Sequence, residues 1–293
     1  MTTLIAILRP DFLLRDALIG SVLVGMICPL VGVYFVLRRM IFLGVALPQL
    51  SAAGIAFSFL LYRALVGQHQ HLEMSERVLA LLGSFCFALG GLLILAALAR
   101  HRETVEGRIG ITYAVATAAT ILFVAADPYG EAHMIDLLKG DILTAPAGNL
   151  LLLTAVFGSV ALILLGFRRE LLLVSFDRDL AVVFGMRTGL WDTLLYFLIG
   201  VTISFGVLTA GPIVTFGFLV VPPLTARLVT RHMLTFSLVA AGLGGATALV
   251  GFYCAYRFDL PLGPAQVAVA SVVLLVIAAA DAVRRALERK RTV

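Results

Sequence analysis

The sequence predicts an all-α membrane protein with about nine transmembrane helices, from its composition, its low charge and its long apolar runs. Of the 293 residues, 61% are hydrophobic and 13% are charged, and the mean hydropathy is +1.06. An ordinary soluble domain is about half apolar and roughly a quarter charged. So few charges could not cover the surface of a soluble protein of this size. These values exclude a soluble globule, a disordered chain and a coiled coil.

Nine apolar runs are each long enough to cross the core of a bilayer, which takes roughly 20 helical residues. We expect transmembrane helices at approximately 15–37, 42–64, 78–99, 109–126, 149–167, 191–208, 212–230, 233–256 and 263–283. They are distributed along the whole chain. We therefore expect residues 1–293 to form a single transmembrane domain.

The basic residues are distributed unevenly between the two sides of these runs. Sixteen of the 22 lie in five segments on one side, namely Arg38–Arg39, Arg100 to Arg108, Arg168 to Arg187, Arg227 to Arg231 and Arg284 to Arg291. Loops rich in Lys and Arg stay in the cytoplasm. We therefore expect a plasma (inner) membrane protein with its N-terminus outside and its C-terminus in the cytoplasm.

The expected spans contain few ionisable groups. No Asp or Glu falls in the middle of a span, and Asp192 and Asp281 lie near cytoplasmic ends. Ionisable residues inside a membrane usually mark proton or ion pathways. Their absence from the span centres argues against a proton-coupled antiporter and a redox pump.

Several expected spans contain prolines, which leave polar backbone groups unpaired inside the membrane. Pro29, Pro48 and the Pro222–Pro223 pair each interrupt an apolar run. A proline within a helix leaves the carbonyl four residues earlier without its donor, which would be Gly25 for Pro29 and Gly44 for Pro48. Such carbonyls persist at membrane depth only when they pack against protein or line a cavity. The prolines therefore indicate either kinks that help helices pack or a lined transport path.

One external loop, residues 68–73, could capture a cation. It contains His69, His71 and Glu73, and such side chains can bind a divalent metal ion. A polar loop can also carry histidines by chance, so the pattern indicates at most weak capture.

The cytoplasmic segment 176–187 is predicted to contain a short amphipathic helix. Asp177 is a suitable N-cap, Leu180, Val183 and Phe184 share one face, and Gly185 is a suitable stop. Such a helix either lies at the membrane interface or docks a cytoplasmic partner.

Five segments together resemble the permeases of zinc/manganese-type ABC importers. They are RRMIFLGVALPQLSAAGIA at 38–56, LKGDIL at 138–143, FDRDLAVVFGM at 176–186, FLVVPPLTARLVTR at 218–231 and GFYCAYRFDLPLGPAQV at 251–267. Each motif is weakly specific by itself. The five occur in order, at the spacing of that family and over most of the chain, and together they make the resemblance strong.

The resemblance implies a type II ABC-importer-like permease that works as a homodimer or a pair of related chains in membrane lipid. Two separate ATPase subunits would bind ATP and Mg²⁺, and an extracytoplasmic solute-binding protein would deliver the substrate. The chain has no G-x-x-x-x-G-K-[ST] phosphate loop. We therefore expect no enzyme activity in this chain. We also expect it to hold no cofactor and to bind no nucleic acid.

The resemblance also implies which residues contact the ATPase. The coupling segment would span about 170–188. Its candidate residues are Phe176, Asp177, Asp179, Ala181 and Gly185.

The chain departs from the family in its second span. Members of the family commonly carry an Asp and a His four residues apart, where both can ligate one ion. This chain has Val45 and Gln49 there. The candidate path residues are Gly44, Val45, Pro48, Gln49, Pro222 and Pro223.

Three interpretations of the cargo follow. The chain could import a divalent metal ion (zinc, manganese or iron) through an altered path. It could import a metal chelate or another small solute, which would not need charged ligands in the helix. It could also be a ligand-less or regulatory subunit whose permease partner holds the ligands.

Overall fold

The computed structural model describes residues 14–66, 76–98, 105–126 and 147–291. These ranges are helical apart from short turns and contain no strand. The helices are α2 Arg15–Leu37, α3 Leu43–Val66, α4 Glu76–Leu98, α5 Val105–Ala126, α7 Ala147–Gly166, α8 Arg168–Phe176, α9 Arg178–Val183, α10 Thr188–Ala210, α11 Pro212–Val229, α12 Met233–Phe258 and α13 Leu262–Arg291.

Each of the nine predicted spans coincides with one helix, which confirms the fold class. The ends agree to within four residues, except that α13 continues beyond the predicted residue 283 to Arg291. Eight of the described helices are long and apolar enough to cross a membrane. The ninth candidate is α7, which continues into α8 after a bend of 70°. The bend precedes Arg168, Arg169 and Glu170, so the apolar stretch ends where α7 ends.

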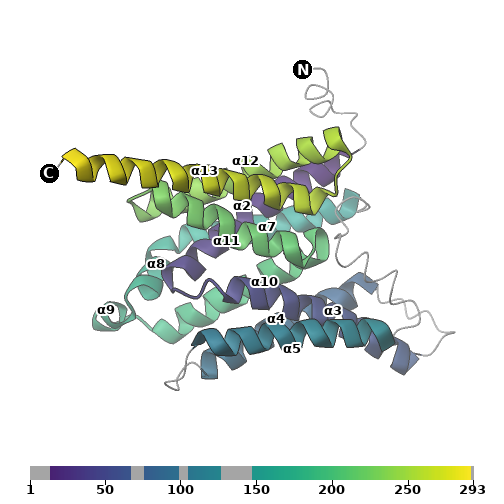
Figure 1. Cartoon of the computed structure of the whole chain (residues 1–293). Coiled ribbons are helices and arrows are strands. Elements are labelled where there is room, and N and C mark those ends of the chain that lie inside the picture. The colour runs from purple at the N-terminus through teal and green to yellow at the C-terminus, as the bar shows by residue number, and fades with distance from the viewer. Residues whose placement is uncertain (1–13, 67–75, 99–104, 127–146, 292–293) are drawn as a thin grey trace.

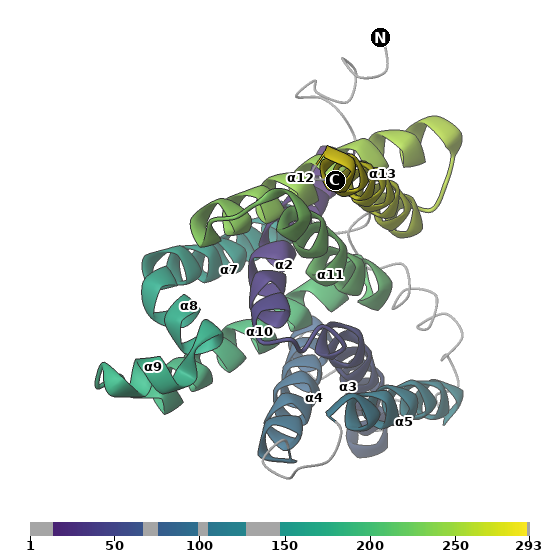
Figure 2. The same cartoon turned by 60° about the vertical axis from the view of Figure 1, so that its left-hand side comes forward.

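Helix α2 lies at the centre of the fold, and α5 and α13 lie at its edges (Figures 1 and 2). Within the apolar span of each helix, 78% of the residues are buried in α2, compared with 22% in α5 and 11% in α13. Helices α3, α4 and α5 form one group. Helices α2, α11, α12 and α13 form a second group, and α10 contacts both. A helix that is apolar on all sides suits the centre of such an arrangement.

Glycines allow α2 to approach its two main neighbours closely. A methyl group added at Gly25 would lie 2.7 Å from Cβ of Ala248 and 2.8 Å from the carbonyl oxygen of Gly244, both in α12. A methyl group at Gly32 would overlap the carbonyl oxygen of Leu219 in α11. Small residues at such crossings let the backbones of membrane helices meet.

At both crossings, a proline leaves a backbone carbonyl free to face a glycine of the neighbouring helix. Pro29 leaves the Gly25 carbonyl without its intrahelical donor, and this oxygen lies where a side chain on Gly244 would be. Pro223 does the same for the Leu219 carbonyl, which faces Gly32. Carbonyls at glycine-lined crossings can accept weak Cα–H···O contacts. For Pro29 and Pro223, the structure therefore supports the packing interpretation.

Gly244→Val should destabilise the protein through the α2–α12 crossing, because the new side chain would meet backbone that cannot move aside. Overpacking of a core costs about 1–3 kcal/mol and sometimes more, so we expect the unfolding midpoint in detergent to fall by roughly 5 °C or more. Gly242→Val is the matched control, since nothing lies within 4 Å of a methyl group there. Equal shifts in the two variants would show that the crossing is not tightly packed.

Candidate coupling surface and transport path

Helices α8 and α9 form a compact unit between α7 and α10. Phe176 ends α8, and Asp177 follows it in an extended conformation. The Asp177 carboxylate accepts a 3.0 Å hydrogen bond from the backbone N–H of Leu180, which confirms Asp177 as the N-cap of α9. The predicted segment 176–187 is therefore the end of α8, a cap and one short helix.

The end of α9 is a tight turn that needs glycine. Gly185 has φ +73°, a conformation in which a side chain is strained. The N–H of Met186 donates to the carbonyl of Ala181 at 3.0 Å, and the N–H of Gly185 donates to Val182 at 2.9 Å. This pair of bonds is the Schellman pattern of a helix C-terminus. Gly185 therefore stops the helix, as the sequence indicates.

One side of α9 faces the body of the protein and the other is open. Ala181 is fully buried (0% exposed) and attaches α9 to its neighbours α8 and α10. Val183 is 81% exposed and Phe184 is 69% exposed. Asp179 is also exposed. Leu180 and Val182 are exposed as well, so the outward apolar side chains are Leu180, Val182, Val183 and Phe184, whereas Ala181 faces inward.

A network of charged and polar groups joins this unit to the end of α2. Arg38 donates to Asp192 of α10 at 2.7 Å and to the hydroxyl of Ser175 in α8 at 3.1 Å. It also lies over the ring of Tyr196, 5.5 Å from the centroid. Arg178, in α9, approaches the other oxygen of Asp192 at 3.2 Å. The side chains of Arg38 and Asp192 are only 12% and 14% exposed.

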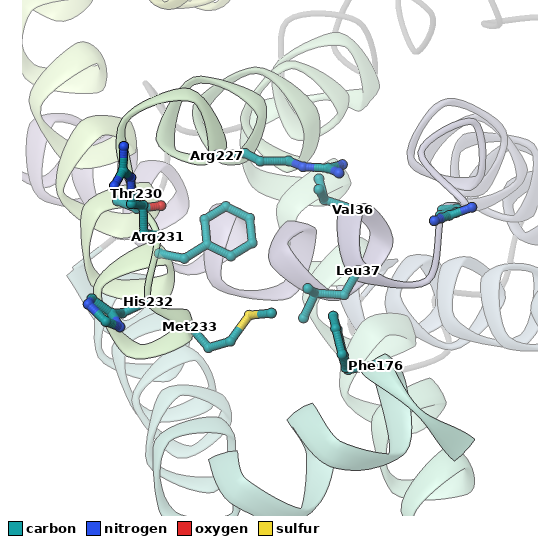
Figure 3. Close-up of a pocket in the computed structure, with 10 residues that line it drawn as sticks. Val36, Leu37, Phe176, Arg227, Thr230, Arg231, His232 and Met233 are labelled. Carbon is teal, nitrogen blue, oxygen red and sulfur yellow. The ribbon is translucent and has the colours of Figure 1, made fainter. Parts of the chain in front are cut away.

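A pocket of about 420 Å³ lies beside Phe176, between the ends of α2 and α11 and the start of α12. Its lining includes four basic residues: Arg39, Arg227, Arg231 and His232. In Figure 3 Arg227 extends toward Val36, and His232 points outward at the edge of the pocket. The basic groups therefore surround the rim and do not converge on one point.

Most of the basic segments counted in the sequence meet at this end of the molecule. The network and the pocket bring together those at the ends of α2 and α11 and at the start of α9. The C-terminal end of α13, with its basic residues, lies on the same side as α8 and α9 (Figure 1). One end of the bundle is therefore strongly basic.

The candidate path residues lie around the start of α3 and the middle of α11. Gly44 is buried, and a methyl group added there would lie 2.9 Å from Val220, next to the buried Pro222–Pro223 pair. Val45 and Gln49 are half-buried, and Pro48 between them is buried. The structure thus brings Gly44 close to α11.

No group of three or more His, Cys, Asp or Glu side chains able to hold a metal ion occurs among the described residues. The external candidates His69, His71 and Glu73 lie outside the described residues, as does the 138–143 motif.

The sequence reasoning missed the Arg38–Asp192 pair. It counted Arg38 only as cytoplasmic charge and noted Asp192 only as an acid near a span end. The available signal was that both residues lie at span ends on the same predicted side. Their pairing depends on α2 and α10 being neighbours, which periodicity does not reveal.

The fold, with its basic end and its short exposed helix, defines a polytopic helical membrane protein. The chain matches the ABC 3 transport family over residues 11–281, and it belongs to this family. It is a permease-type membrane subunit of the kind found in ABC importers.

Relatives with known names span nearly the whole chain. The manganese import system permease protein ScaB of Streptococcus gordonii is 25% identical over 279 residues, covering 94% of each chain. A Haemophilus influenzae protein, described as a probable iron transport system membrane protein, is 26% identical and covers 91% of this chain and 89% of its own.

The solved structure of PsaBC from Streptococcus pneumoniae in complex with Fab has a similar fold. The TM-score is 0.78 at 22% identity, with 94% of each chain covered. A second similar structure is described as a metal-chelate type ABC transporter in an inward-facing conformation. Its TM-score is 0.71 at 18% identity, with 90% of this chain and 85% of that chain covered.

Proposed function

We propose that this chain forms the transmembrane path of an ATP-driven importer for a first-row divalent metal ion: manganese, zinc or iron. The proposal is supported by membership of the ABC 3 transport family and by relatives named for manganese and iron transport. A second copy of the chain completes the path, and a solute-binding protein delivers the ion from outside.

The exposed face of α9 is the observation that carries the proposed coupling to an ATPase. Val183 and Phe184 are large, exposed apolar side chains at the C-terminal end of α9, at the basic end of the molecule. Phe176, at the end of α8, is also 69% exposed and lines the neighbouring basic pocket. Exposed apolar groups rimmed by charge are typical of protein interaction sites. The ATPase subunit binds this surface, hydrolyses ATP and supplies the energy.

The basic end is the cytoplasmic end in this proposal. Positive residues are retained in the cytoplasm during membrane insertion, and an ATPase can reach α9 only from that side. The C-terminus is then cytoplasmic and the N-terminus external.

The cargo has to pass Val45 and Gln49 without the charged pair that is common in the family. A bare dication in a low-dielectric path needs compensating charge or several oxygen ligands. Gln49 offers one carbonyl oxygen, and the Gly44 carbonyl freed by Pro48 offers another. The ion is therefore held weakly in the path.

This weak path favours a second candidate cargo, a metal chelate. Organic ligands would neutralise the ion, and the path would then need no Asp or His. An aromatic and enlarged pocket in the cognate binding protein would favour the chelate, whereas a compact His/Glu pocket would favour the ion.

Val183→Glu should disrupt ATPase docking, because it places a charge in the centre of the exposed apolar face. Removal of a central interface contact commonly costs 2 kcal/mol or more, so we expect the affinity for the ATPase to fall by more than about tenfold. Binding is measured by calorimetry on purified permease.

Leu287→Glu is the matched control, since Leu287 is 59% exposed near the C-terminal end of α13, which lies at the same end of the bundle but well apart from α9 (Figures 1 and 2). It should leave binding unchanged. Undiminished binding by Val183→Glu would mean that α9 lies on the membrane surface and does not dock the ATPase.

The double variant Val45→Asp/Gln49→His should gain affinity for metal, because it restores a carboxylate and an imidazole at i, i+4. We expect binding of Mn²⁺ or Zn²⁺ by the permease to tighten by about tenfold or more. Leu60→Asp/Ala64→His has the same spacing further along α3 and gives the baseline for any such helical pair. If both double variants bind equally, positions 45 and 49 do not line the path.

A further inference from the structure

We propose that Arg38 is a positioning residue that transmits movement of α9 to α2, through its ion pair with Asp192. This inference rests on the proposed function, in which the ATPase docks on α9. It assigns to Arg38 and Asp192 a role in coupling ATP hydrolysis to transport.

The Arg38 side chain joins the end of α2 to two other helices, α8 and α10. Its guanidinium reaches Asp192 at 2.7 Å and Ser175 at 3.1 Å, and its third polar neighbour is the hydroxyl of Tyr196 at 3.4 Å. Arg178, at the start of α9, holds the second oxygen of Asp192. The Asp192 carboxylate therefore lies between a residue of α9 and the end of α2.

This network is built to resist sliding. A guanidinium is planar and donates in fixed directions, which makes it more directional than an ammonium group. Both members of the central pair are largely shielded from water, so the pair is weakly screened. A displacement of α9 that pulls on Asp192 must therefore either move Arg38 or break a shielded ion pair.

Movement of Arg38 reaches the candidate path through two rigid connections. The first is α2 itself, which meets α11 and α12 at glycine crossings without room to slide. The second is the turn into α3, where Arg39 has φ +56° and the N–H of Met40 donates to the carbonyl of Phe35 at 2.9 Å. This turn leads directly to Gly44 and Val45.

Stability alone does not account well for the pair. A buried ion pair gains little over well-packed apolar residues, because both charges lose their hydration. An ion pair, however, fixes the position of α2 relative to α10. An apolar contact would let the two helices slide past each other more easily.

The experiment compares Arg38→Gln and Asp192→Asn with the control Arg284→Gln. Arg284 carries the same charge and also makes an ion pair, but its partner is Glu288 in the same helix α13, and both side chains are 64% exposed. Each permease is assembled with its ATPase and binding protein in proteoliposomes. The readouts are ATPase binding, ATP hydrolysis and Mn²⁺ imported per ATP hydrolysed.

We expect Arg38→Gln and Asp192→Asn to bind the ATPase and hydrolyse ATP, but to import at least tenfold less Mn²⁺ per ATP. The double variant should be no worse than the worse single variant, since both remove one link. Arg284→Gln should keep the wild-type ratio.

A merely structural role would lower folded permease, hydrolysis and import in proportion and leave the ratio unchanged, and that result would overturn the proposal. A wild-type permease that binds no ATPase would instead overturn the proposed function. The two failures are therefore distinguishable.

Discussion

The close approach of α2 to α11 and α12 is the constraint on which the rest of the structure depends. Gly25 and Gly32 lie at its two crossings, and each meets backbone of the neighbouring helix. Lipid tails are as apolar as the helix surfaces, so hydrophobic burial cannot hold membrane helices together. Instead, close packing of the backbones holds the helices together at these crossings, where Pro29 and Pro223 leave carbonyls free to face glycines. A central helix fixed in this way cannot move independently of its neighbours.

Because α2 is fixed in this way, the basic end of the molecule is connected mechanically to the rest of the bundle. The short helix α9 is held by Ala181 and by its two caps, and it presents apolar side chains outward. The Arg38 network connects that helix to α2, and the α2–α3 turn connects α2 to the candidate path. A force applied at α9 can therefore reach Gly44 and Val45 through contacts that are each short and directional.

Much of this arrangement could be predicted from the sequence, because membrane spans and caps are local features. The nine apolar runs correspond to nine of the observed helices, and Asp177 and Gly185 mark the two ends of α9. The sequence pattern did not predict α8 as a separate helix, although it placed the start of the next helix correctly after Asp177. It also did not reveal that Ala181 faces inward, since small apolar residues fit either side of a helix.

The long-range features could not be predicted in the same way. The pairing of Arg38 with Asp192 and of Gly32 with Leu219 depends on which helices are neighbours, and no periodicity encodes that. The prolines left two interpretations open from sequence. The structure favours packing for Pro29 and Pro223, because a glycine of the facing helix lies against each freed carbonyl.

The central claim is that the chain conducts a divalent metal ion despite Val45 and Gln49. The most direct test is uptake of radiolabelled Mn²⁺, Zn²⁺ and Fe²⁺ by proteoliposomes containing the permease, its ATPase and its binding protein. We predict uptake of at least one of these ions that requires both ATP and the binding protein. An assembled complex that hydrolyses ATP and imports a metal chelate, but none of the free ions, would contradict the claim.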